Sequence, residues 1–143
     1  MPSLSPIGWN VVMARLGLAL LFGAGIGLDR EHRDKPAGLR TNMLVALGSA
    51  LFVLIPVQTG LAETDSTALA RSIQGIITGV GFVGAGSILR ENKDKVRGLT
   101  SATAVWISAG IGIANGSPMA LALTRDGGAL IILRVVKLVE KYF

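Results

Sequence analysis

The sequence of 143 residues contains no cysteine and a single histidine. Disulfide bonds, thiol catalysis and cysteine metal sites are therefore excluded. Aromatic residues make up only 5% of the chain and charged residues only 16%, whereas half of the residues are hydrophobic. A soluble domain of this length carries more charge and spreads it along the chain. Here the charges gather in a few short stretches between long apolar runs, so we predict an integral membrane protein.

The apolar runs predict one all-α transmembrane domain over residues 1–143, a polytopic membrane helix bundle. A membrane-spanning helix needs about 20 mostly apolar residues, and we expect five spans at about residues 9–28, 42–61, 72–89, 99–114 and 118–136. In the first, Arg15 lies near one end, where its side chain can reach the interface. In the last, a central Arg125 costs about 2.5–3.5 kcal/mol on insertion scales. Either Arg125 faces protein, which we favour, or this span is broken.

The distribution of Lys and Arg predicts the orientation of the bundle. The connectors at residues 29–41 and 90–98 each contain four of these cations, whereas the turn at residues 115–118 contains none. Short loops rich in Lys and Arg remain in the cytoplasm. We therefore expect a membrane protein with its N-terminus outside and its C-terminus in the cytoplasm. This placement accounts for the net charge of +5, so we do not expect nucleic-acid binding.

The two cationic connectors resemble each other in sequence. At an offset of 60 residues, eight positions between Phe22 and Val45 are identical to their counterparts between Phe82 and Val105. We interpret them as a parallel internal repeat of two helix hairpins, related by an axis along the membrane normal. A chain rich in Gly and Leu produces some of these identities by composition alone, so the repeat is a hypothesis.

Glycines in the first and third apolar runs predict close helix packing. In a membrane helix, small residues four positions apart let the backbone of another helix approach closely. We expect this role for Gly23, Gly27, Gly75, Gly79, Gly81, Gly84 and Gly86. Residues 79–84 also match the pattern GxGxxG, but a dinucleotide site needs that pattern between a strand and a helix of a soluble unit. We therefore predict no nucleotide site and no cofactor.

The connectors also carry a candidate cytoplasmic polar site, for which two interpretations remain open. In the simpler one, pairs such as Asp29 and Arg33 at i, i+4 extend the first helix as a solvated turn up to Pro36. In the other, both connectors form one composite site beside two helix N-termini, capped by residues 41 or 42 and 100 or 101. The candidate residues are Asp29, Arg30, Glu31, Lys35, Arg40, Thr41, Arg97 and Thr100.

The ligand of such a site also remains open. Arg40 and Arg97 suit an anion or a lipid headgroup, whereas the carboxylates suit Mg²⁺, which prefers oxygen ligands. Asp29, Glu31 and Asp34 are scattered around a helix by their spacing, which argues against a metal site on one helix. Because no nucleophile is paired with a base, we do not expect an enzyme.

Three blocks of the chain resemble the MgtC/SapB family of bacterial inner-membrane proteins. They are Gly27–Thr41, Gly79–Leu89 and Val96–Trp106. The resemblance implies a multi-spanning plasma-membrane protein linked to Mg²⁺ limitation and, in pathogens, to virulence inside host cells. It favours regulation of other membrane proteins, including ATP synthase, over Mg²⁺ transport. Asp29 stands where the family usually has Glu, and Ser101 where it usually has Thr; both replacements keep the chemistry.

The expected function is therefore regulation of other membrane proteins in magnesium homeostasis. The expected partners are the lipid bilayer, ATP synthase or transporters, and further copies of the chain. Many family members add a soluble C-terminal domain, whose functions we do not expect in a chain that ends at Phe143. The alternative is an ion or small-solute transporter built from the two repeats, which would place ionisable groups near mid-membrane. The first four spans offer only Gln74, Thr78, Thr103 and Ser108 there, which favours regulation.

Overall fold

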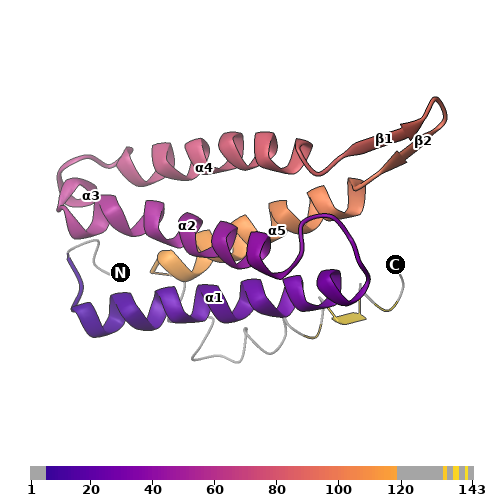
Figure 1. Cartoon of the computed structure of the whole chain (residues 1–143). Helices are drawn as coiled ribbons and strands as arrows, with labels where there is room; N and C mark the ends of the chain where they lie inside the picture. Colours follow the sequence, from indigo (N-terminus) through magenta and orange to yellow (C-terminus); the bar gives the residue numbers. More distant parts are fainter. Residues whose placement is uncertain (1–5, 119–133, 135–136, 139–140, 142–143) are drawn as a thin grey trace.

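The computed structural model describes residues 6–118 and residues 134, 137, 138 and 141. The elements in this part are, in order, α1 (Trp9–His32), α2 (Leu39–Gln58), α3 (Leu61–Thr64), α4 (Ala68–Ala85), β1 (Leu89–Asn92), β2 (Lys95–Arg97) and α5 (Leu99–Gly116). The four long helices lie side by side as a bundle (Figure 1). The prediction of a helical bundle is confirmed, whereas the antiparallel hairpin of β1 and β2 was not expected.

Three helices, α1, α2 and α4, are long and apolar enough to cross a membrane. The chain is thus a multi-pass membrane protein. Helix α5 begins at Leu99 as expected but is not among these candidates. The described part therefore has three candidate spans where we expected four. Nearly all of the expected fifth span, residues 118–136, lies outside the described residues.

Glycines precede both helices that leave the connectors. Helix α2 begins after Gly38, and α5 begins after Gly98, whose φ of 93° is readily adopted only by glycine. The expected caps at Thr41 or Asn42 and at Thr100 or Ser101 are therefore wrong, since these residues lie inside the first helical turn. Helix α4 ends at Ala85 rather than at residue 89.

The core lies where α1, α2 and α5 pack against one another, and α4 packs on α2 and α5 from the edge of the bundle (Figure 1). One cluster of small residues, Ala19, Ala46 and Ala50, joins α1 to α2. A second cluster joins α2, α4 and α5 and consists of Val53, Ile76, Val80, Val105 and Ala109. Short side chains in the first cluster let the helix axes approach closely.

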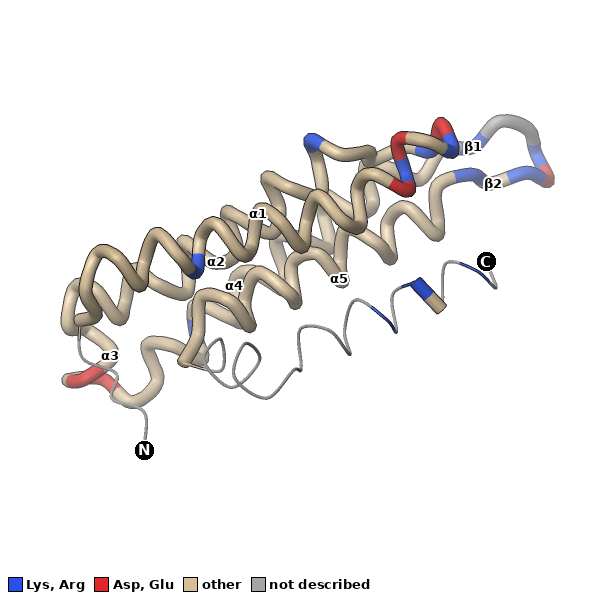
Figure 2. The backbone as a smooth tube through the Cα atoms, turned by 90° about the horizontal axis from the view of Figure 1, so that it is seen from below, with Lys and Arg blue, Asp and Glu red and all other residues tan. Residues whose placement is uncertain are grey.

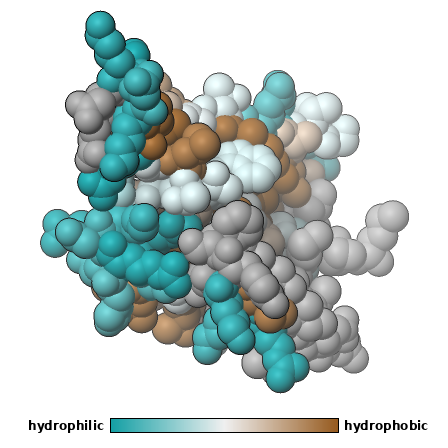
Figure 3. All heavy atoms as spheres, turned by 90° about the vertical axis from the view of Figure 1, so that its right-hand side faces the viewer, coloured by the Kyte–Doolittle hydropathy of each residue, from teal (hydrophilic) through white to brown (hydrophobic). Residues whose placement is uncertain are grey.

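Charged residues gather at the ends of the bundle, and the helices between them carry few (Figure 2). Both connectors lie at the same end, where hydrophilic side chains cover much of the surface (Figure 3). The pairs α1–α2 and α4–α5 therefore run in the same sense. However, the first connector is a loop with positive φ at Asp34 and Ala37, whereas the second is a β-hairpin. The structure does not show the internal repeat, which stays a hypothesis.

Candidate functional site

The first connector is held by its own carboxylates. Helix α1 continues to His32. The Asp29 carboxylate forms an ion pair with Arg33, one helical turn later, with 3.2 Å between Oδ1 and Nε. The Glu31 carboxylate accepts a hydrogen bond of 2.8 Å from the Leu39 N–H and so caps the start of α2. A Cβ atom at Gly38 would collide with this carboxylate. A side chain at position 38 would therefore displace the Glu31 carboxylate from its place beside the Leu39 N–H.

One candidate pair from the two connectors is brought together. The Arg30 Nη1 donates to the Thr100 hydroxyl over 3.3 Å, which joins the end of α1 to the first turn of α5. Arg40 and Arg97 lie exposed on α2 and β2, and Lys35 is exposed in the loop. Thr41 is half-buried inside the first turn of α2. The pair of Arg30 and Thr100 thus directly links the end of the first connector's helix to the helix that follows the second connector.

Two candidate carboxylates contact groups of the first connector itself. Asp29 contacts Arg33, and Glu31 contacts the start of α2. Among residues 6–118 and the four described beyond them, no group of three His, Cys, Asp or Glu residues is placed to hold a metal ion. The geometry therefore favours a structural role for these two carboxylates over binding of Mg²⁺.

A buried polar seam between α2 and α5 was missed by the sequence analysis as a unit. Asn42 is fully buried, and its amide donates to the carbonyls of Ala37 (2.8 Å) and Gly38 (2.9 Å). Its Oδ1 accepts a hydrogen bond of 2.7 Å from the buried Ser108 hydroxyl. The buried polar residues of the seam are Asn42 and Ser49 on α2, and Ser101, Ser108 and Asn115 on α5. Within each helix they are seven residues apart, and this spacing is the sequence signal that could have revealed the seam.

The side chain of Arg15 does not reach the interface, contrary to our expectation. It is only 5% exposed, and its Nη1 donates to the carbonyl of Gly116, the last residue of α5, over 3.2 Å. The Nε of Arg15 has no partner within the described residues. The guanidinium lies at the end of α5 where unpaired carbonyls and the helix dipole favour a cation. Arg15 therefore ties α1 to the end of α5.

The predicted glycines fall into two groups. A Cβ atom at Gly23 would lie 2.7 Å from the Asn42 carbonyl oxygen, and one at Gly27 would lie 2.5 Å from the Leu39 Cα, so both glycines permit α1 to contact α2. Gly84 similarly lies against Ala102 of α5. The remaining predicted positions have open space or contact only their own helix; they are Gly75, Gly79, Gly81 and Gly86.

Two further glycines make close approaches between helices, and the sequence analysis missed them. A Cβ atom at Gly112 would overlap the carbonyl oxygen of Ala46, and one at Gly116 would lie 2.6 Å from that of Ala50. Both contacts join α5 to α2. The spacing of four residues between Gly112 and Gly116 was the signal that could have revealed them.

An exposed stripe follows the outer side of α4. Its members are spaced by three or four residues along the helix and therefore share one face; they are Gln74, Thr78, Gly81 and Ala85. The opposite side of α4 carries the buried residues Ile76, Val80 and Gly84. The Thr78 hydroxyl bonds back to the Gln74 carbonyl over 3.0 Å. We call these four residues the outer α4 stripe.

Comparison with known proteins finds one matching family and several similar proteins. Residues 16–142 match the MgtC family. Protein SrpB of Synechococcus elongatus is 48% identical over 120 residues, which cover 76% of this chain and 64% of SrpB. Protein SapB of Bacillus subtilis is 36% identical over 118 residues, covering 78% of this chain and 51% of SapB.

Protein MgtC of Salmonella typhimurium is 48% identical over 98 residues, covering 68% of this chain and 40% of MgtC. The chain thus spans about 40–64% of the length of these three curated relatives. No solved structure matches the chain.

Proposed function

Since the chain belongs to the MgtC family, we propose that it acts in bacterial adaptation to low Mg²⁺ as a regulator of other membrane proteins. The proposed action is binding without catalysis: a helix of another membrane protein docks on α4. The observation that carries this proposal is the outer α4 stripe, which presents polar and small residues on the exposed side of a candidate membrane span.

The chemistry of this stripe suits another helix better than lipid. A side-chain amide in the hydrocarbon region finds no hydrogen-bond partner in lipid, and the amide of Gln74 has none within the described residues. Gly81 and Ala85 leave room for close approach of a second helix, which is how helices associate in membranes. Phe82 beside them is 82% exposed and adds apolar contact area.

The position of the charges supports binding over transport. Charged side chains of the described helices lie at the ends of the bundle, apart from Arg15, which is buried against the end of α5 (Figure 2). Within the polar seam, Asn42 and Ser108 are fully buried and bonded to each other. We propose that the connectors lie in the cytoplasm, as their Lys and Arg content predicts.

Growth at low Mg²⁺ tests the proposal in a strain that requires this protein. We expect Gln74→Leu and Gly81→Leu each to impair growth without changing the amount of protein in the membrane. Gly110→Leu on α5 is the matched control, because a Cβ atom at Gly110 also meets open space. A photo-crosslinking residue at position 81, but not at position 110, should capture a second membrane protein.

Normal growth of both stripe variants would contradict the proposal. Mg²⁺ flux into proteoliposomes that contain only this protein would instead support the transporter alternative. Capture of a second copy of the chain at position 81 would show that the stripe serves self-association, which would also contradict docking of another protein on it.

A further inference from the structure

An apolar groove runs between α2 and α4, on a different side of α4 from the outer stripe. Its volume is about 620 Å³, within the range of about 300–1,000 Å³ typical of ligand sites. Gly48 of α2 and Gly75 and Gly79 of α4 leave its floor without side chains, since a Cβ atom at each would meet nothing within 4 Å. The apolar walls are formed by Leu44, Val45, Phe52, Ile55, Ile76 and Val83.

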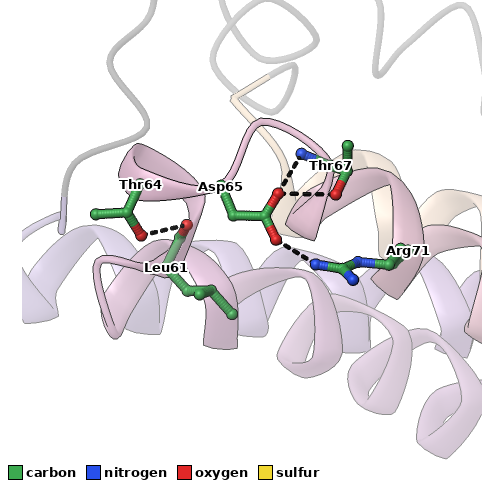
Figure 4. A network of polar contacts seen from close by, with 5 residues as sticks. All are labelled: Leu61, Thr64, Asp65, Thr67 and Arg71. Atoms are coloured by element: carbon green, nitrogen blue, oxygen red, sulfur yellow. Dashed lines mark hydrogen bonds and ion pairs between the residues drawn. The ribbon is translucent and has the colours of Figure 1, made fainter.

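A cation stands at one end of this groove. Arg71, in the first turn of α4, lines the groove together with Ser72. One guanidinium nitrogen of Arg71 is bound by the Asp65 carboxylate (Figure 4). Asp65 is itself fixed by the Thr67 N–H (2.9 Å) and the Thr67 hydroxyl (2.7 Å). The guanidinium is thus held at the mouth, and its other N–H groups remain available.

We propose that this groove binds a phospholipid, with one acyl chain lying along Gly75 and Gly79 and the phosphate bound by Arg71 and Ser72. This inference goes beyond the proposed function and concerns a separate surface. A guanidinium is suited to a phosphate because its planar N–H groups can form two parallel bonds to it. The glycine floor and apolar walls exclude a polar ligand from the rest of the groove.

The length of the groove agrees with a single acyl chain. From Arg71 to Val83 the helix advances 12 residues, or about 18 Å at 1.5 Å per residue. Half of a bilayer's hydrocarbon core is about 15 Å thick. A chain that starts at Arg71 would therefore reach the far end of the groove at about the bilayer midplane. A groove with polar groups at one end and apolar walls of this length matches an amphiphilic ligand, with a polar head and an apolar chain.

Native mass spectrometry of the purified protein with two lipids tests the proposal. The probes are dioleoylphosphatidylglycerol and dioleoylglycerol, which share acyl chains and differ in the phosphate-containing headgroup. We expect the phospholipid to bind about tenfold more tightly, as one charge-assisted contact provides. Arg71→Gln should remove this preference and leave dioleoylglycerol binding unchanged. Dioleoylphosphatidylethanolamine should bind like the phosphatidylglycerol if the phosphate, rather than net charge, is recognised.

Matched glycine variants test the position of the chain. Gly79→Leu should weaken binding of both lipids about tenfold, because the new side chain fills the groove without striking the backbone. Gly110→Leu, which lies in open space outside the groove, should bind as the wild type does. Unchanged thermal midpoints of both variants would show that the fold is intact. The stripe variants Gln74→Leu and Gly81→Leu should keep lipid binding, so this test is independent of the proposed function.

Three results would overturn the proposal. Equal affinity of wild type for the phospholipid and dioleoylglycerol would remove the phosphate site at Arg71. Wild-type lipid binding by Gly79→Leu would show that the chain lies elsewhere. A wild-type dimer that binds no lipid and is split by Gly79→Leu would show that a second copy fills the groove.

Discussion

Helices α5 and α4 each contain a pair of glycines four residues apart, yet the two pairs have opposite surroundings. Gly112 and Gly116 in α5 touch the backbone of α2 so closely that no side chain fits between them. Gly75 and Gly79 in α4 have no atom within reach of an added Cβ. The spacing therefore predicts a bare helix face, but not which molecule covers that face. In α5 it is a helix of the same chain, and in α4 it is open to an external ligand.

The largest expected effect concerns the contact of the α5 glycines with α2. Gly112→Leu should destabilise the protein by about 3 kcal/mol, at the upper end for overpacking, because its Cβ would overlap the Ala46 carbonyl. The measurement is the thermal midpoint of the monodisperse peak in detergent by size-exclusion chromatography. Gly110→Leu, two residues away in open space, is the control. Equal loss in both variants would show that helix contact is not the cause.

The polar seam beside these glycines provides the second test. Asn42→Ala should cost about 2 kcal/mol, because it leaves the Ala37 carbonyl and the Ser108 hydroxyl without their Asn42 partner and removes one of two bonds to the Gly38 carbonyl. Ser108→Ala removes one bond and should cost about 0.6 kcal/mol, the average for membrane helices. Thermal midpoints of the two variants and of the double variant measure the coupling. Strict additivity would contradict the bond between these side chains.

The third test compares a carboxylate of the first connector, Glu31, which caps the start of α2, with a carboxylate of the second. Glu31→Ala should destabilise the protein by about 1 kcal/mol through loss of the cap on Leu39. Glu31→Gln should cost less, since an amide oxygen still accepts. Hydrogen exchange at the Leu39 N–H should accelerate in Glu31→Ala. Asp94→Ala in the hairpin is the control, because Asp94 is exposed with no partner within the described residues. Unchanged exchange in Glu31→Ala would contradict the cap.

The smallest expected effect is the pH dependence of stability that Asp65, just before α4, contributes. Hydrogen bonds from the Thr67 side chain and N–H, with a smaller contribution from Arg71, lower the pKa of Asp65 below its ordinary value of 3.8. Because the folded pKa is depressed, this carboxylate stabilises the fold above about pH 4, and the contribution is lost as pH falls through the folded pKa. Asp65→Asn should therefore melt slightly below the wild type at pH 6, and this gap should narrow as pH falls from about 4 through the lowered pKa of Asp65. A gap that stays constant as pH falls would assign the effect to something other than ionisation.

Local sequence determined part of this architecture. The i, i+4 pair of Asp29 and Arg33 predicts the extension of α1 past its apolar run, and the structure shows that extension. Arg90 and Glu91 are the counterparts of Arg30 and Glu31 at an offset of 60 residues, yet they form a strand. The reason is that α4 ends at Ala85 and the chain reaches Arg90 in extended form. Identical charged residues thus adopt different structures according to where the preceding helix ends.

Other features depend on contacts between distant residues and could not be predicted from local patterns. The spacing of Gly75, Gly79 and Gly81 predicts close approach of another helix, yet a Cβ atom at each meets open space, because the neighbours of this face depend on how α4 docks on α2 and α5. Glu31 was predicted as a candidate site residue, and it caps α2 because the loop brings the start of α2 back to it. The groove arises from two helices together, so neither sequence segment contains it.

The bond between Arg15 and the Gly116 carbonyl has a consequence for synthesis of the chain. These residues are 101 positions apart. At about 5–20 residues per second on the ribosome, α1 exists for roughly 5–20 s before its partner carbonyl is made. During that time the guanidinium can be hydrated only at the membrane surface, which it can reach from the second turn of α1. We therefore expect Arg15 to be buried only after α5 is complete.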